Sequence, residues 1–309
     1  MLKNGIKKRI FLIISSIFII LIIYLFPIKK EDTNYEEKKD KTKDVIIYLL
    51  DEKEFVSRVS VYMKENELEN KIKEMIEYIT IDSKNSSYIK EGFKPIIPKN
   101  TKLLSVSIDN SLVKLNFSKE LLTIDEANED KMISAIIYSL TSLDGIKEIS
   151  IYVEGNLLTK LPNSGKSLPS ILNRSYGINK VYDLTKIKGS TKTTIYYLSK
   201  YKDYYYYVPV TMVNNDEKEK IEVIIEEMAS KSVYQTSLIS YLKEAKEVSY
   251  ELNNDKLNIN FTKNLFDNLN KNNLVESVIY SINLSIKDNY NIKEVNYNID
   301  DYSYRNYNI

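Results

Sequence analysis

The residues of this sequence that most resemble a hydrolase site are pairs of carboxylates. Adjacent acids occur at Asp125-Glu126, Glu226-Glu227 and Asp300-Asp301. A glycosidase needs two carboxyl groups around one bond, one as acid and the other as base or nucleophile. Neighbouring residues of a helix or strand point to different faces, so adjacency does not place two carboxylates around one substrate. We interpret these pairs as solvated surface and predict no catalytic residue from them.

Missing residue types exclude most other catalytic and metal chemistry. The chain has no His, no Cys and no Trp. Without His or Cys no Ser/His or Cys/His nucleophile can form, and zinc loses its preferred ligands. The acidic run from Asp125 to Asp130 lacks the Gly and the spacing of a calcium loop, and no glycine-rich phosphate-binding motif occurs. We therefore expect no enzyme activity, no metal and no cofactor.

A run of four tyrosines is the strongest candidate for recognition of a partner. Tyr combines an apolar ring with a polar hydroxyl, which suits contacts with glycans and with proteins. Because side chains alternate along a strand, about half of the run faces inwards, and packing within the chain is the competing interpretation. The candidate interaction surface consists of Tyr204, Tyr205, Tyr206 and Tyr207.

The charges of the chain are balanced, with 44 basic and 43 acidic residues that are intermixed along the sequence. A protein that binds a nucleic-acid backbone usually gathers positive charge on one face or stripe. This chain has no such cluster, and we predict no nucleic-acid partner.

The elements that would position these residues occur twice in the chain. The segment from Leu115 to Leu121, LNFSKEL, reappears as INFTKNL from Ile259 to Leu265. Further matches follow in the same order, among them Ile47-Tyr48 with Ile195-Tyr196. Another pairs Ile137-Tyr138-Ser139 with Ile279-Tyr280-Ser281. A repeat of this length indicates a duplicated globular domain rather than a solenoid.

Each copy predicts the order hairpin, helix, hairpin, helix, strand. In the first copy apolar residues alternate at Leu104, Val106 and Ile108 ahead of an Asn110-Ser111 turn, which predicts a hairpin. Apolar residues recur at helical spacing in the segments before and after this hairpin. Strands with one apolar face and helices with one apolar stripe are satisfied when helices cover a sheet. The predicted fold class is α+β. It comprises two tandem similar domains in ββαββαβ order, each a mixed β-sheet with two helices packed on one face.

The N-terminus predicts a membrane anchor. The segment from Ile10 to Ile28 carries no charge and is long enough to span a bilayer as one transmembrane helix. Only basic charges precede it, which predicts a cytoplasmic N-terminus. A cleaved signal peptide is the alternative, although the small residues of a cleavage site are missing. We expect a single-pass cell membrane protein with extracytoplasmic C-terminal domains.

Changes in composition along the chain predict five segments. Pro and Gly are densest between the two copies, which indicates an interdomain connection. The predicted segments are a cytoplasmic tip and transmembrane anchor over 1–28, a flexible charged stalk over 29–44, a first domain over 45–155, an interdomain linker over 156–192 and a second domain over 193–309.

Several motifs of the first copy are recognisable together. They are the loop from Ile97 to Val106, the strand from Val113 to Ser118, the helical residues Ile137 to Leu140 and the segment from Ile146 to Ile149. In this combination they resemble the GerMN-domain family. The second copy departs from the pattern, because Tyr241 to Ala245 replace its Pro-x-x-Thr loop. The lipid-attachment Cys of many relatives is also missing.

The resemblance implies a non-enzymatic structural protein of sporulation, similar to ring-building modules, and it carries over no catalytic residue. The leading hypothesis is a membrane-anchored, extracytoplasmic scaffold of sporulation and spore germination that acts through protein contacts of two GerMN-like domains. Its partners would be other envelope or sporulation-complex proteins, met in the intermembrane space of sporulating cells. The alternative is an envelope module whose Tyr-rich hairpin binds peptidoglycan or another glycan. Whether copies form a homo-oligomer stays open.

Overall fold

The computed structural model describes residues 44–184, 189–215, 218–229, 238, 242, 245–271, 274–300 and 302–308. The predicted anchor and nearly all of the predicted stalk lie outside these residues. Within the described part, no helix is both long enough and apolar enough to cross a bilayer.

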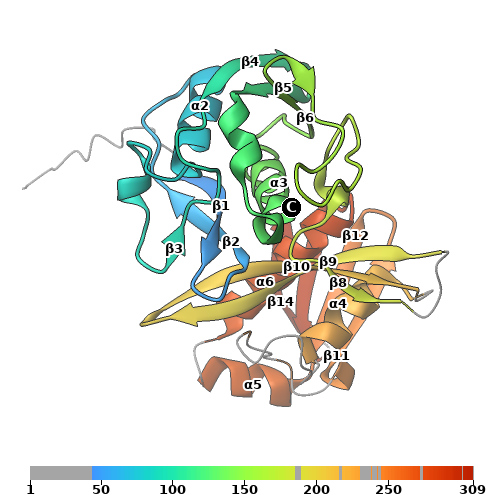
Figure 1. Ribbon diagram of the computed structural model, residues 1–309. Helices are drawn as coiled ribbons and strands as arrows, with labels where there is room; N and C mark the ends of the chain where they lie inside the picture. Colours follow the sequence, from blue (N-terminus) through green and yellow to red (C-terminus); the bar gives the residue numbers. More distant parts are fainter. Residues whose placement is uncertain are drawn as a thin grey trace, which may run out of the picture. The chain divides into compact units, whose positions relative to one another are not determined.

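The first half of the chain follows the predicted order of elements (Figure 1). Its main elements are β1 (Val45–Asp51), β2 (Val56–Val61), α2 (Leu68–Tyr78), β4 (Leu103–Asp109), β5 (Leu112–Phe117), α3 (Glu126–Leu140) and β6 (Glu148–Val153). Short elements lie between or after them: η1 (Ser86–Tyr88), β3 (Phe93–Lys94), η2 (Lys119–Thr123), β7 (Asn156–Leu157), η3 (Arg174–Tyr176) and β8 (Val181–Asp183).

The second half repeats this order with one helix added. Its elements are β9 (Thr191–Tyr201), β10 (Tyr204–Asn214), α4 (Lys220–Ala229), η4 (Ala245–Glu247), β11 (Val248–Asn253), β12 (Lys256–Phe261), α5 (Lys263–Lys271), α6 (Val275–Asn289), β13 (Glu294–Ile299) and β14 (Tyr302–Asn308). Helix α5 stands where the first half has the short turn η2. The α+β class is confirmed, since both halves combine sheets with helices.

The prediction of one mixed sheet in each domain is wrong. The strands β4-β5-β6-β7 form one four-stranded sheet, and β11-β12-β13-β14 form another of the same topology. The leading hairpins stand apart from both, and they join each other in a six-stranded sheet of order β3-β1-β2-β10-β8, with β9 on β10. Alternating hydrophobicity shows which face of a strand is buried, but not which strand lies next to it.

The expectation of two helices on one face of one sheet fails in the first half, where α2 contacts β4 of one sheet and α3 contacts mainly β1 of the other. Strands β1 and β10 are buried along almost their whole length, so they need cover on both faces. Helix α3 supplies part of it, because it contacts β1 and β2 of one sheet and β6 of the other. In the second half both α4 and α6 contact β9. Helices α3, α4 and α6 therefore lie against the shared sheet.

Each half has a hydrophobic core of its own. One core runs from Val45 to Ile178 and the other from Ile195 to Tyr297. The first includes Leu161, Leu168 and Leu172, which lie in the predicted linker. Much of the segment 156–192 thus packs on the first domain, and Phe93 contacts both cores.

Candidate functional site

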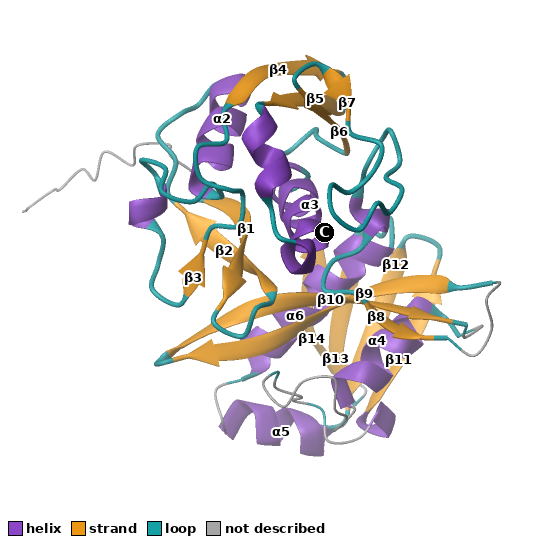
Figure 2. Cartoon of the chain, viewed as in Figure 1, coloured by secondary structure: helices purple, strands orange, loops and turns teal. Residues whose placement is uncertain are grey.

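The candidate site lies where the two halves meet, and the backbone of β10 builds it. Strand β10 pairs with β9 over its full length. Along its other edge, Tyr207 pairs with Arg58 of β2, and Met212 to Asn214 pair in parallel with β8. Figure 2 shows the long hairpin of β9 and β10 beneath β1 and β2 in this view. The sheet is continuous from one half into the other, and we call this region the joint.

Tyr206, a predicted interaction residue, is buried in the joint. Its hydroxyl donates to the carboxylate of Asp51 over 3.0 Å and accepts from the Ser199 hydroxyl over 3.0 Å. Asp51 is fully buried and also accepts the Ser57 hydroxyl and the backbone N–H of Phe55. Burial raises the pKa of Tyr206, which keeps its hydroxyl protonated as a donor. The side chain therefore ties the second half to the first.

Two neighbouring tyrosines make further contacts, Tyr204 across the joint and Tyr207 within its own half. The Tyr204 ring packs beside Phe93 at 6.3 Å between centroids, and the ammonium of Lys90 lies 3.3 Å from its centroid. Tyr207 meets Tyr280 edge to face at 5.0 Å.

The fourth tyrosine differs from the other three. Tyr205 is 44% exposed, whereas the other three are buried or partly buried. The candidate surface Tyr204 to Tyr207 thus stays a prediction, but most of it is occupied by contacts within the chain.

An ion pair at the joint escaped sequence analysis. Arg174 of η3 donates through Nη1 to Asp288 of α6, and the other oxygen of that carboxylate accepts the Tyr196 hydroxyl over 2.9 Å. The hydroxyls of Tyr196 and Tyr48 lie 2.9 Å apart. The match of Ile47-Tyr48 with Ile195-Tyr196 in the repeat could have indicated that the two tyrosines occupy equivalent positions. Arg174 has no counterpart in the repeat, and nothing in its sequence neighbourhood marks it.

The protonation states of this cluster are fixed at neutral pH. Burial raises the pKa of Tyr48 and that of Tyr196, so both hydroxyls keep their protons. Burial by itself would lower the pKa of Arg174, but Asp288 and the tyrosines Tyr48, Tyr196 and Tyr138 together outweigh it and the pKa rises. A general acid or base works best with a pKa near the operating pH. The cluster is therefore suited to holding the halves together rather than to proton transfer.

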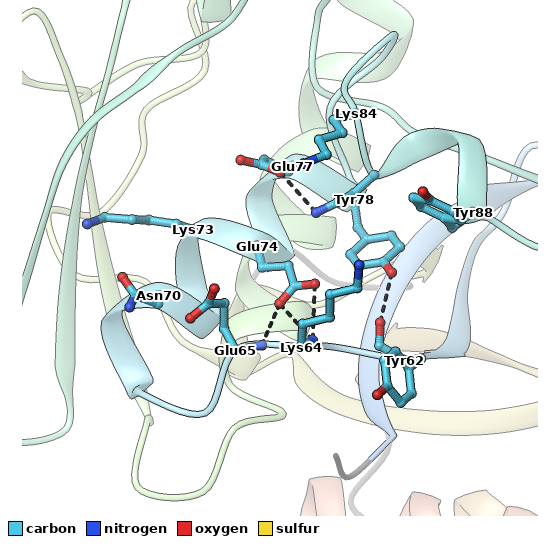
Figure 3. A pocket seen from close by; sticks show the side chains of 11 residues that line it. Tyr62, Lys64, Glu65, Asn70, Lys73, Glu74, Glu77, Tyr78, Lys84 and Tyr88 are labelled. Atoms are coloured by element: carbon cyan, nitrogen blue, oxygen red, sulfur yellow. Dashed lines mark hydrogen bonds between the residues drawn. The ribbon is translucent and has the colours of Figure 1, made fainter. Parts of the chain in front are cut away.

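The described part of the structure has two large hollows, one at the joint and one away from it. One lies at the joint, has a volume of about 560 Å³ and includes Arg58, Arg174 and Asp288 in its lining. The other, of about 600 Å³, lies between the end of β2 and helix α2 (Figure 3). In the second, Glu74 accepts the backbone N–H groups of Lys64 and Glu65, so this carboxylate serves the local fold. Among the described residues no group of three or more His, Cys, Asp or Glu side chains is placed to hold a metal.

The arrangement of elements defines a class of protein: one α+β domain type used twice and joined through a shared sheet. Residues 46–159 match the sequence model of the family described as "Germane: Sporulation and spore germination". The chain is 24% identical to the spore germination protein GerM of Bacillus subtilis (strain 168) over 279 residues, which cover 88% of this chain and 75% of that protein.

A solved structure has the same fold. The tandem GerMN domains of the sporulation protein GerM from Bacillus subtilis superimpose with a TM-score of 0.73 and 22% identity. The match covers 84% of this chain and 92% of that structure. The resemblance to the GerMN-domain family is therefore confirmed, and the chain has the fold of tandem GerMN domains.

Proposed function

We propose that this chain is a non-enzymatic scaffold protein of sporulation and spore germination that acts through protein contacts of its two domains. Its similarity to GerM, a protein named for spore germination, supports the biological setting. The protonation states at the joint favour a structural role over catalysis.

The joint is the observation that carries the scaffold role. A sheet shared by both halves, a partly buried ion pair and the Tyr206–Asp51 hydrogen bond hold the domains together. Relative motion is the default for domains joined by a small interface, and a shared sheet opposes it. Two domains held in this way present their outer surfaces at a fixed spacing, as a scaffold requires.

The membrane setting belongs to the same proposal. The uncharged segment 10–28, preceded only by basic charges, supports an anchor with a cytoplasmic N-terminus and extracytoplasmic domains. In sporulating cells the domains would lie in the intermembrane space and contact other envelope or sporulation-complex proteins. A reporter fused to Ile309 that is active outside the cytoplasm, and inactive after 10–28 is deleted, would support this topology.

Deletion and co-purification test the biological role. We expect a strain without the gene to form fewer heat-resistant spores or to germinate more slowly. A tagged full-length protein should recover the same envelope proteins repeatedly from sporulating cells and not from vegetative cells. Normal spore formation and germination in the deletion strain would show that the sporulation assignment is wrong.

The glycan-binding alternative is favoured by a single observation, the exposure of Tyr205. A sacculus pull-down with the full chain and with Tyr205→Ser tests it. Tyr302→Ser is the matched control, because Tyr302 is an exposed tyrosine (81%) outside the Tyr204 to Tyr207 run. Selective loss with Tyr205→Ser would support a glycan site. Equal retention of both variants would remove this alternative.

A further inference from the structure

The hollow at the joint is built from both halves of the chain. Its lining includes Tyr48 and Tyr196, whose hydroxyls hydrogen-bond, and the ion pair of Arg174 with Asp288. The loops 141–147 and 173–175 and the last part of α6 also line it. With a volume of about 560 Å³, it has room for several side chains of a partner.

The charges of this hollow are not balanced. Asp288 is neutralised by Arg174, which leaves Asp144 as the remaining carboxylate in the lining. Three further cations line the hollow, and none of them forms an ion pair with a described residue: Arg58, Lys147 and Lys287. Elsewhere in the described chain many lysines lie beside a carboxylate, as Lys180 does beside Asp130 at 2.9 Å. The hollow therefore carries positive charge that no carboxylate of the described residues neutralises through an ion pair.

Arg58 gives the sharpest indication of a ligand. Its side chain is half-buried, and its guanidinium lies 5.4 Å from the Tyr280 ring centroid. Within the described residues it has no hydrogen-bond acceptor. A guanidinium carries five N–H donors in a planar fork that matches a carboxylate. A half-buried Arg with free donors is thus prepared for an acceptor from outside the chain.

We propose that this hollow binds an acidic segment of a protein partner. Carboxylates of the segment reach Arg58, Lys147 and Lys287, and its apolar side chains lie against Ile46, Leu143 and Leu284, which also line the hollow. Tyr and Arg are enriched among the residues that dominate protein interfaces, and apolar lining distinguishes a peptide from a simple anion. The inference rests on the proposed function, since it names the chemistry of the partner that a scaffold would hold.

The position of the site couples binding to the joint. Arg58 and Lys147 belong to the first half, whereas Lys287 belongs to α6 of the second. A ligand that contacts all three binds only when the halves are together, and it stabilises that arrangement by mass action.

The test measures binding of a short fluorescein-labelled peptide of alternating Glu and Leu to the full-length chain by anisotropy. We expect Lys147→Gln/Lys287→Gln to weaken binding about tenfold, the change that accompanies the loss of about 1.4 kcal/mol. Lys64→Gln/Lys84→Gln, which removes two lysines from the other hollow (Figure 3), is the matched control and should leave affinity unchanged.

Arg58 is tested by two replacements in the same assay. Arg58→Lys keeps the charge and should retain part of the affinity that Arg58→Gln loses, because the ammonium lacks the fork. Circular dichroism shows whether each variant is folded. If Arg58→Gln does not fold, the lysine pair above still decides the outcome.

Three results would overturn the proposal. They are equal binding of a peptide with Gln in place of Glu, equal loss in the control variant, and binding of tripolyphosphate as tight as that of the peptide with the same residue dependence. The last would assign the hollow to phosphate. Each leaves the deletion phenotype untouched, so failure of this inference is distinguishable from failure of the proposed function.

Discussion

At the scale of single residues, Arg174 makes the largest set of polar contacts at the joint. Arg174 donates to Asp288, to the Thr141 hydroxyl over 2.9 Å and to the Tyr138 carbonyl over 3.3 Å. Its guanidinium also lies 4.7 Å from the Tyr138 ring centroid. An Arg held on so many sides fixes the groups around it. Removing its carboxylate partner would leave a partly buried charge without its counterion.

We predict that Asp288→Asn lowers the free energy of unfolding by about 3 kcal/mol, the lower end of the cost of breaking a buried ion pair. The lower end applies because the Arg174 side chain keeps 26% of its exposure. Urea unfolding of the full chain measures it. The control is Glu69→Gln, whose partner Lys73 is on the surface one helical turn away, and it should cost less than about 0.5 kcal/mol. Equal costs for the two variants would contradict a structural role for Arg174.

A second prediction concerns alkaline pH. The phenolic oxygen of Tyr290 accepts the Ile221 N–H over 2.8 Å at the start of α4, and burial raises the pKa of Tyr290 to about 12 from 10.0. The folded state then holds this proton more tightly than the unfolded state. The resulting stability is complete below pH 10 and is lost as pH rises towards 12.

The urea midpoint of the full chain should therefore fall over this interval, and Tyr290→Phe should reduce the fall. Tyr302→Phe serves as the control because that ring is exposed and should leave the fall unchanged. A midpoint in the Tyr290→Phe variant that falls as steeply as in the unaltered chain would be inconsistent with this account.

At the scale of elements, the structure aligns α3 with α6 one helical turn further along α6 than the sequence match does. Tyr48 N–H donates to the Ser139 hydroxyl over 2.9 Å, and Tyr196 N–H donates to that of Ser285 over 2.9 Å. Ser285, rather than Ser281, is thus the equivalent of Ser139. Consistently, Tyr138 is fully buried whereas Tyr280 is 40% exposed. Residues four apart lie on one helical face, so two short apolar motifs can align at either turn.

The corrected helix alignment predicts matching effects in the two halves. Ser139→Ala and Ser285→Ala each leave a buried strand N–H without its acceptor, which costs about 1–3 kcal/mol. Both serines are fully buried. Ser60→Ala, at an exposed position of β2, should change stability by less than about 0.5 kcal/mol. Urea unfolding of the three variants compares them, and a neutral Ser285→Ala beside a costly Ser139→Ala would refute the alignment.

At the scale of the whole molecule, the chain has two cores but one connecting sheet. The cores belong to separate halves, as expected for a duplicated domain. The leading hairpin of each half nevertheless pairs with that of the other, through Arg58 and Tyr207. Separation of the halves would break this pairing and the contact of Phe93 with the second core, so it is costly.

We predict that the two halves unfold together. Calorimetry of the full chain should give one transition whose calorimetric and van 't Hoff enthalpies agree. Asp288→Asn weakens the joint and should broaden or split the transition, whereas Glu69→Gln should not. Two well-separated transitions in the unaltered chain would show that the joint does not couple the halves.

By itself the sequence determined the duplication, the α+β class, the order of elements and the resemblance to the GerMN family. These features depend on local periodicity and on short motifs such as LNFSKEL and INFTKNL, which a sequence displays directly. The tertiary structure decided which strands pair across the joint, how α3 and α6 correspond and what surrounds Tyr206. It also brought Arg174 to Asp288 and left Arg58 without an acceptor among the described residues. Such contacts join residues far apart in the chain, and their partners are set by packing rather than by local pattern.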